Sequence, residues 1–318
     1  MTEQQEIHLW AKCHHCGAQP IFGAAFRCET CPVGPDADLC QACYARYQLR
    51  EIPHPAPNSG APPGLPATHR FNRLHGALPE SLAPWLQTPC PNTAAPRVPR
   101  GFLVRPDFQS SDYSAFGGYG FVTQHAGGSV ILTALHVMDE IIKHKHIDAT
   151  ARNPHYSGTE LPREVTSVRL FDVLDARWML HPLGEAGPML VLPDARTGDD
   201  EPLAWRDIAA FQVKASDVLT PVKLAAKDPK VGDVLWLAAR MMDGSHTRRA
   251  VCVEVTPQTL IFRYDDKKVP PPHTSGTAIL DGNGEVVGIN TGSGRFEDKE
   301  FGHANPLGSI RSHLASAA

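Results

Sequence analysis

Residues 269–292, VPPPHTSGTAILDGNGEVVGINTG, decide how the rest of the chain is interpreted. A serine followed by glycine, Ser275 and Gly276, stands in a loop that leads into the apolar run 278–280. The tight turn 281–284 then leads into a second apolar run, so the pattern predicts a β-hairpin with the serine at its rim. Ser-Gly pairs are common in ordinary loops, and this one becomes informative only through partners elsewhere in the chain.

Two upstream segments contain such partners. His136 follows the apolar run 130–135, and Asp207 precedes the apolar run 208–213. A serine hydroxyl is too weak an acid to attack a carbonyl at neutral pH, so it needs an imidazole to take its proton and a carboxylate to orient that imidazole. His136, Asp207 and Ser275 are therefore the candidate catalytic residues. Asp172, which also follows an apolar run, is the alternative carboxylate.

Five motifs follow one another along residues 105–318: GYGFV at 118–122, TALHV at 133–137, DIA at 207–209, SG at 275–276 and VVGINT at 286–291. Taken together, they resemble the trypsin-like serine peptidases of the chymotrypsin fold, most closely the disulfide-free HtrA-type domains, which have the same pieces in the same order. The resemblance implies a mostly β domain of two six-stranded barrels. It places His136 and Asp207 in the first barrel and Ser275 in the second, with the catalytic site between them.

The same resemblance implies further site residues. The backbone amides of His273 and Ser275 would form the oxyanion hole, although the family usually has glycine at the first position, where a positive φ is needed. Val269 would form the floor of the primary substrate pocket, which favours small or apolar side chains over basic ones. Asn290, Thr291 and Gly292 would line the pocket wall and pair with the substrate strand.

Six of the eight cysteines form three Cys-x2-Cys pairs near the N-terminus: Cys13/Cys16, Cys28/Cys31 and Cys40/Cys43. A two-residue gap lets a turn direct two thiolates at one zinc ion, which takes four ligands. Three pairs leave a second ion half-coordinated, and His54 and His69 are candidates for its remaining ligands, with His75 as an alternative. In a module of this size, zinc binding supplies folding free energy on the order of 10 kcal/mol per site.

This segment resembles a ZZ-type zinc finger. The resemblance implies interleaved ligand sets, the first ion taking Cys13, Cys16, Cys40 and Cys43 and the second taking Cys28, Cys31, His54 and His69. Several ZZ fingers bind a free N-terminal amine, which implies Asp36 and Asp38 as ammonium acceptors. The alternative is that these aspartates only cap the turn before Cys40.

Length and composition set the outer limits. The 318 residues, 42% of them hydrophobic and 20% charged, are typical of a soluble globular protein with one domain of ordinary size and a small one. Proline-rich stretches at 53–66 and 79–106 favour three parts: a finger at 1–75, a stiff extended linker at 76–104 and a peptidase domain at 105–318. Within the linker, residues 82–87 suggest one short turn of helix. A pI near 6.5 suggests neither a nucleic-acid nor a membrane partner.

The start of the chain has no basic and apolar signal pattern, and no run is long enough for a transmembrane helix, so the cytoplasm is the expected compartment. The leading hypothesis is an intracellular, ATP-independent serine endopeptidase, in a bacterial setting, whose finger binds a protein partner or substrate. The alternative is an inactive peptidase-like scaffold or sensor that binds protein termini or partners. Whether the finger recruits or inhibits stays open.

Overall fold

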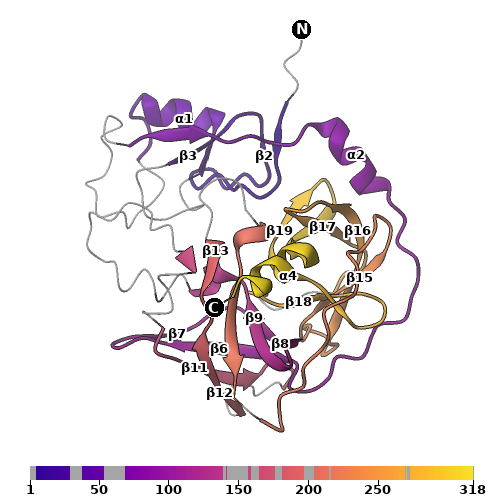
Figure 1. The fold of residues 1–318 in the computed structure, drawn as a ribbon. Coiled ribbons are helices and arrows are strands. Elements are labelled where there is room, and N and C mark those ends of the chain that lie inside the picture. The colour runs from indigo at the N-terminus through magenta and orange to yellow at the C-terminus, as the bar shows by residue number, and fades with distance from the viewer. Residues whose placement is uncertain are drawn as a thin grey trace.

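The computed structural model describes residues 5–28, 38–53, 69–138, 141, 157–158, 165–175, 181–196, 204–214, 216–268, 270 and 273–317. Its ribbon is shown in Figure 1. Cys31, Asp36, His54 and Val269 lie outside the described residues. Within the described part of the chain, no helix is both long and apolar enough to span a membrane.

The first barrel is built from antiparallel strands and closes on itself. In order of neighbours, its strands are β6 (Leu103–Gln109), β8 (Gly120–His125), β9 (Gly128–Thr133), β14 (Ala209–Val213), β12 (Pro182–Met189) and β11 (Ser167–Asp172), and β11 pairs back with β6. The short β7 (Ser114–Phe116) extends β6, while β10 (Ser157–Gly158) and β13 (Leu192–Arg196) form a separate pair. Fully buried aromatic side chains fill the interior, among them Phe108, Phe121 and Phe211.

The second barrel is also closed. Its strands, in order of neighbours, are β15 (Val234–Ala238), β16 (Thr247–Val255), β17 (Leu260–Tyr264), β20 (Lys299–Pro306), β19 (Val286–Phe296) and β18 (Ala278–Leu280). Helix α4 (Leu307–Ala315) follows β20. The predicted double six-stranded barrel is therefore confirmed, and the predicted hairpin after the serine is the β18–β19 pair.

The N-terminal finger is small. It contains β1 (Ile7–His8), β2 (Ile21–Phe22), β3 (Ala25–Cys28), β4 (Asp38–Cys40), α1 (Gln41–Gln48) and β5 (Phe71–Arg73), with β3 between β4 and β5. Ile21, Leu39 and Tyr47 are fully buried and pack around Cys13 and Cys43. A core of this size leaves much of the stabilisation to other interactions.

The segment after the finger contains a longer helix than the single turn predicted at 82–87, and this helix is not part of an extended spacer. The helix is α2 (Pro79–Gln87), with Pro79 at the first helical position, where a missing N–H costs nothing. Leu82 and Trp85 of this helix pack on the outer face of the second barrel, against Val253, Ile261 and other apolar side chains. A spacer would stand clear of the barrel, whereas this helix buries an apolar face on it.

A buried arginine fixes this attachment. Arg263 on β17 is 6% exposed. Its Nη1 donates to the carbonyl oxygens of Trp85 at 2.7 Å and Leu86 at 2.6 Å, and its Nη2 donates to that of Thr88 at 2.5 Å. These carbonyls belong to the last turn of α2, which lacks partners within the helix, so the guanidinium satisfies them.

Candidate active site and zinc site

The structure brings His136 and Asp207 together. His136 lies in the 3₁₀ turn η3 (Leu135–Met138) just after β9, and Asp207 lies between the turn η6 (Ala204–Arg206) and β14. Because β14 pairs with β9, both side chains start from the same end of neighbouring strands. His136 Nδ1 donates to Asp207 Oδ2 at 2.5 Å, and the backbone N–H of His136 donates to Oδ1 at 2.9 Å.

This pairing sets the ionisation state of the acid and the tautomer of the base. Burial opposes ionisation of Asp207, but the charge of His136 and hydrogen bonds from its ring and backbone lower the pKa of the carboxyl. An ionised carboxylate only accepts, so Nδ1 carries the proton and Nε2 is left to act as a base. Asp172, the alternative acid, lies elsewhere: it accepts from Leu174 N at 3.0 Å and from Arg100 Nη2 at 3.5 Å.

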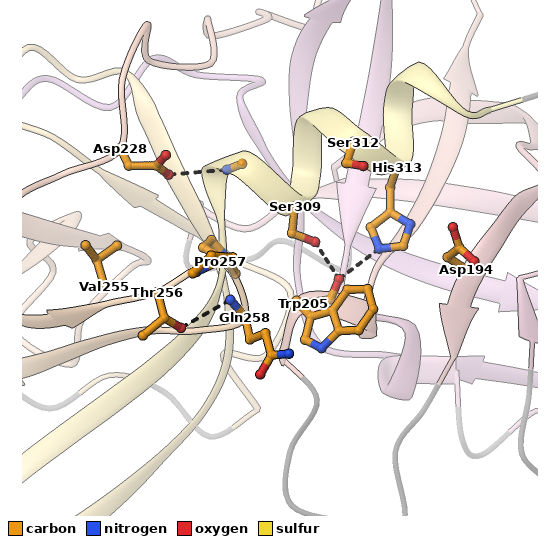
Figure 2. A pocket seen from close by; sticks show the side chains of 12 residues that line it. Asp194, Trp205, Asp228, Val255, Thr256, Pro257, Gln258, Ser309, Ser312 and His313 are labelled. Atoms are coloured by element: carbon orange, nitrogen blue, oxygen red, sulfur yellow. Dashed lines mark hydrogen bonds between the residues drawn. The ribbon is translucent and has the colours of Figure 1, made fainter.

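A hydrogen-bonded frame holds the segment before Asp207. The carbonyl of Trp205 accepts from Ser309 Oγ at 2.5 Å and from His313 Nε2 at 2.8 Å, both on α4 (Figure 2). Burial lowers the pKa of His313, so this imidazole is neutral and donates through Nε2. The last helix of the second barrel therefore fixes the approach to an acid that belongs to the first barrel.

The loop that carries Ser275 is held from both barrels. On the side of the first barrel, the Ser275 carbonyl accepts from Tyr119 N at 2.7 Å. On the side of the second barrel, Gly276 N donates to the carbonyl of Asn290 on β19, also at 2.7 Å. A Cβ on Gly276 would overlap the Tyr119 carbonyl oxygen and the Thr133 hydroxyl, and its φ is +85°. Only glycine fits there. Since Thr133 ends the strand that leads to His136, the serine lies at the same end of the barrel as the imidazole.

His273 adopts the backbone conformation that the family's glycine would supply. Its φ is +63°, in the left-handed region that side chains rarely adopt. Within the described residues, the amides of His273 and Ser275 do not donate to another backbone group. The two N–H groups that the resemblance assigns to the oxyanion hole therefore have no backbone acceptor among the described residues, and the conformation of His273 carries backbone strain.

The strand assigned to the pocket wall has a free edge. Strand β19 pairs with β18 as far as Ile289, and the Asn290 backbone is still bonded on that side to Gly276 and Thr277. Within the part of the chain that the structure describes, only Thr291 and Gly292 therefore have a strand partner on one side alone. The Asn290 side chain donates from Nδ2 to Thr274 O at 3.1 Å and so ties the strand to the serine loop. A polypeptide could pair with the open edge.

Sequence reasoning missed His303, which lies behind this wall. Thr291 Oγ1 is 2.7 Å from His303 Nδ1 and donates to the His303 carbonyl at 3.2 Å. Burial lowers the pKa of His303 to about 4, with Asp207 opposing and His136 adding to the effect, so the imidazole is neutral. The strand register places it beside Gly292, where a Cβ would meet its Nε2 at 2.5 Å. The sequence offered one signal for His303: it stands directly before residues 304–307, where the last strand of the barrel ends.

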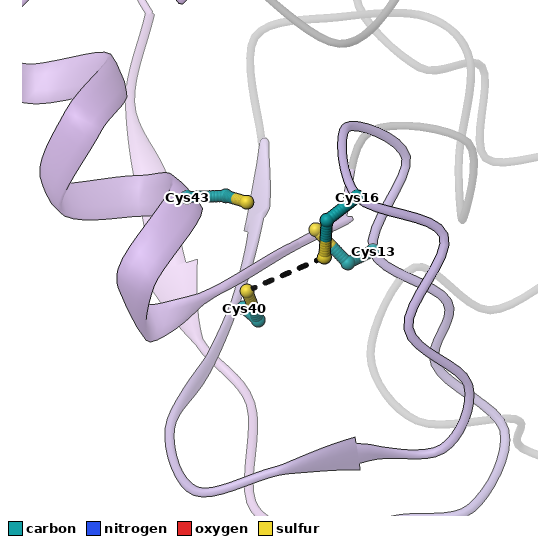
Figure 3. Close-up of side chains that lie close together, drawn as sticks. All are labelled: Cys13, Cys16, Cys40 and Cys43. Carbon is teal, nitrogen blue, oxygen red and sulfur yellow. Dashed lines mark hydrogen bonds between the residues drawn. The ribbon is translucent and has the colours of Figure 1, made fainter.

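Four of the cysteines form a metal-binding cluster. The sulfurs of Cys13, Cys16, Cys40 and Cys43 all lie within 4.8 Å of one another. Figure 3 shows the four side chains converging from a turn, the end of β4 and the start of α1, with Cys16 Sγ 3.9 Å from Cys40 Sγ. Four sulfurs bound to one zinc ion would stand about 3.8 Å apart. The cluster therefore fits a tetrahedral zinc site, and it is the first ligand set implied by the resemblance to ZZ fingers.

Half of the second ligand set is also brought together. Cys28 Sγ lies 3.7 Å from His69 Nδ1, and both residues are buried. Cys31 and His54, the other two predicted ligands, lie outside the described residues. The alternative histidine, His75, is exposed and lines a different pocket.

Asp38 has a partner within the finger. It is fully buried, and its two carboxylate oxygens accept from Arg27 Nε at 2.7 Å and from Arg27 Nη2 at 2.9 Å. Burial raises the pKa of this carboxyl, while Arg27 opposes the shift. These contacts leave the predicted ammonium acceptor engaged by an internal guanidinium, and Asp36 lies outside the described residues.

Comparisons with known proteins bear on the two parts separately. Residues 7–50 match the family model for the ZZ-type zinc finger, which confirms that part of the sequence interpretation. No curated protein matches the chain.

Two solved structures are similar in fold. A serine endoprotease from Yersinia pestis is 18% identical with a TM-score of 0.43, over 68% of this chain and 64% of that one. The active form of the Rv3671c protease from M. tuberculosis is 17% identical with a TM-score of 0.42, over 72% of this chain and 90% of that one. The alignment thus spans less than two thirds of the Yersinia chain. At such identities and TM-scores, neither comparison carries an argument about activity.

Proposed function

We propose that the chain is an ATP-independent serine endopeptidase whose zinc finger binds a protein partner or substrate. The observation that carries the proposal is the His136–Asp207 pair, in which Nδ1 and the backbone N–H of one histidine both donate to one carboxylate, 2.5 and 2.9 Å away. This pair lies at the end of the barrel where Gly276 of the serine loop packs against Thr133. Such an arrangement serves nucleophilic catalysis.

The proposed reaction is acyl transfer. Ser275 Oγ attacks the substrate carbonyl while His136 Nε2 takes its proton, and the Asp207 carboxylate stabilises the resulting imidazolium. The amides of Ser275 and His273 would stabilise the oxyanion. His136 then gives its proton to the leaving amine, and a water molecule, activated by the same imidazole, releases the acyl group. These steps need no nucleotide, which agrees with ATP independence.

The proposed finger carries two structural zinc ions. The first would be held by Cys13, Cys16, Cys40 and Cys43, and the second by Cys28, Cys31, His54 and His69. Each zinc ion would join four side chains of the finger and take no part in the catalytic steps. Since thiolate ligands need a reducing compartment to stay unoxidised, we place the protein in the cytoplasm.

A fluorophosphonate label tests the proposed enzyme, because it reacts with an activated serine. We expect an adduct on the zinc-loaded wild type and none on Ser275→Ala, while Ser111→Ala, an exposed serine in the β6–β7 turn, is labelled like wild type. Peptide mapping should place the adduct on Ser275. Absence of labelling in folded wild type would favour the inactive scaffold, to which the strained His273 at the oxyanion position gives some support.

A further inference from the structure

A pocket of about 480 Å³ lies between the finger and the outer face of the second barrel. From the finger and the segment after it, Trp10 and Trp85 line it; from the barrels, Trp205, Glu254, Ile261 and His303 do. Neither the catalytic assignment nor the zinc sites use this pocket. Its walls come from parts of the chain that are far apart in sequence, so it exists only while the finger is docked.

The aromatic walls are held in place. The Trp10 ring packs on the His303 ring with their centroids 4.4 Å apart. It also lies against Gly294 of β19, where any Cβ would collide with the Leu9 carbonyl and the Trp10 ring. The backbone of Trp205 is fixed by the two hydrogen bonds from α4 that Figure 2 shows. Indole faces bind cationic side chains by cation–π attraction. The Trp205 ring already has such a partner, since the Arg206 guanidinium carbon lies 4.2 Å from its centroid, so Trp10 is the indole offered to a ligand.

The pocket contains an uncompensated carboxylate. Glu254 on β16 is about half-buried; burial raises the pKa of its carboxyl, with the Trp85 side chain as an opposing hydrogen-bond partner. Within the described residues, Glu254 forms no ion pair with a lysine or arginine. Arg27 also lines the pocket, but its guanidinium is bound by Asp38. Burial lowers the pKa of both His8 and His303, so these two imidazoles are neutral.

The pocket adjoins the proposed catalytic site. Trp205 stands two residues before Asp207, and His303 is paired with Gly292 of the strand that has an open edge. The electrostatic influence of Asp207 and His136 reaches the His303 ring. A polypeptide that pairs with the open edge of β19 would therefore be separated from His303 by that one strand, close enough for a long side chain to reach the pocket.

We propose that this composite pocket binds an arginine or lysine side chain of the polypeptide substrate, with Glu254 as its counter-ion, Trp10 as its aromatic wall and Trp205 at its border. The inference rests on the proposed peptidase function and deepens it: the finger forms part of the substrate-binding surface. Guanidinium groups both stack on indoles and pair with carboxylates, so arginine fits best. This basic preference belongs to a secondary pocket and is separate from the primary pocket, whose expected preference is small or apolar.

The pocket can be tested without catalysis. In zinc-loaded full-length Ser275→Ala protein, N-acetyl-arginine amide should shift the indole N–H NMR signals of Trp10 and Trp205, assigned with Trp10→Phe and Trp205→Phe. N-acetyl-citrulline amide, a neutral analogue of similar shape, should bind about tenfold more weakly. Glu254→Gln should abolish the difference, and Glu297→Gln, an exposed acid in the β19–β20 turn, should preserve it. Equal shifts by both amides, or an unaltered difference in Glu254→Gln, would overturn the proposal.

Cleavage profiling supplies the second measurement. On a peptide library, the wild type should prefer arginine or lysine at one position away from the scissile bond, and Glu254→Gln should lose that preference while still reacting with the fluorophosphonate. A basic preference that survives in Glu254→Gln would contradict the assignment. If the wild type neither cleaves nor reacts with the label, the peptidase function fails, while the NMR titration still decides whether the pocket binds a cation.

Discussion

In the barrels, the residues of the proposed catalytic site are fixed by backbone pairing: β14 against β9 sets His136 beside Asp207, and Gly276 joins the serine loop to β19. In the finger, four thiols from residues 13–43 meet around a core of only a few large side chains. Strand pairing forms without a ligand, whereas thiols crowded together have no attraction for one another. Loss of metal should therefore affect the two regions very differently.

The largest expected effect is that of zinc removal. With a chelator, amide exchange protection across residues 7–50 should collapse, because each site contributes on the order of 10 kcal/mol, while β15–β20 stay protected. Cys40→Ser should lose one zinc ion of about two per chain, and Cys90→Ser, which replaces a cysteine outside the cluster, should lose none. Hydrogen exchange and metal analysis check this. A finger that keeps its protection without metal would remove the contrast between the two regions.

The next effect breaks the catalytic pair and leaves the barrel intact. Asp207→Asn removes the acceptor that fixes the proton on His136 Nδ1, so the rate of peptide cleavage should fall about 10⁴-fold with the fold retained. Asp172→Asn is the matched control, a buried acid that contacts Leu174 and Arg100. It should lower the melting temperature, because these contacts weaken, and leave the rate of peptide cleavage within about threefold of wild type. Similar rates for the two variants would contradict the assignment of Asp207.

The same contrast explains what the sequence could predict. Short apolar runs and glycine turns indicated β-strands and the hairpin after Ser275, since these signals are local, while the two barrels were implied by the resemblance carried by the motifs around His136, Asp207 and Ser275. The two-residue cysteine spacing, also a local signal, indicated the zinc cluster. His303 escaped detection because its neighbours are set by a shift in strand register between Asn290 and Gly292, which periodicity does not reveal.

The docking of the finger was equally hidden. Prolines suggested an extended spacer, but α2 packs on the barrel because Arg263, far along the chain, donates to the carbonyls of its last turn. Trp10 meets His303 across an even longer sequence separation. Arginine and tryptophan have no signature that distinguishes such a contact from an exposed position. The composite pocket therefore could not be predicted from the sequence and was found only in the structure.

A third prediction separates the attachment of the finger from its folding. Arg263→Met keeps an apolar stem and removes three hydrogen bonds to carbonyls of α2, so the attachment should weaken by about 3 kcal/mol while zinc content is unchanged. Limited proteolysis should then cut residues 88–98 faster, and the composite pocket should bind the arginine amide more weakly. Arg311→Met, a change in α4 on another face, is the control. Unchanged proteolysis would show that apolar packing alone holds the finger.

The smallest effect concerns backbone strain at the oxyanion position. His273 has a φ of +63°, a conformation that costs an ordinary side chain roughly 1 kcal/mol and costs glycine nothing. Glycine also gains freedom in the unfolded chain, which offsets part of that relief. His273→Gly should therefore leave the free energy of unfolding within about 1 kcal/mol of wild type and raise the fluorophosphonate labelling rate by a few fold, because its amide turns toward the oxyanion more easily. Glu297→Gly, at a second left-handed residue with φ +54° in the β19–β20 turn, should relieve comparable strain without changing the labelling rate. If both variants speed labelling equally, the effect comes from general loosening of the barrel and the amide of residue 273 has no special place in the reaction.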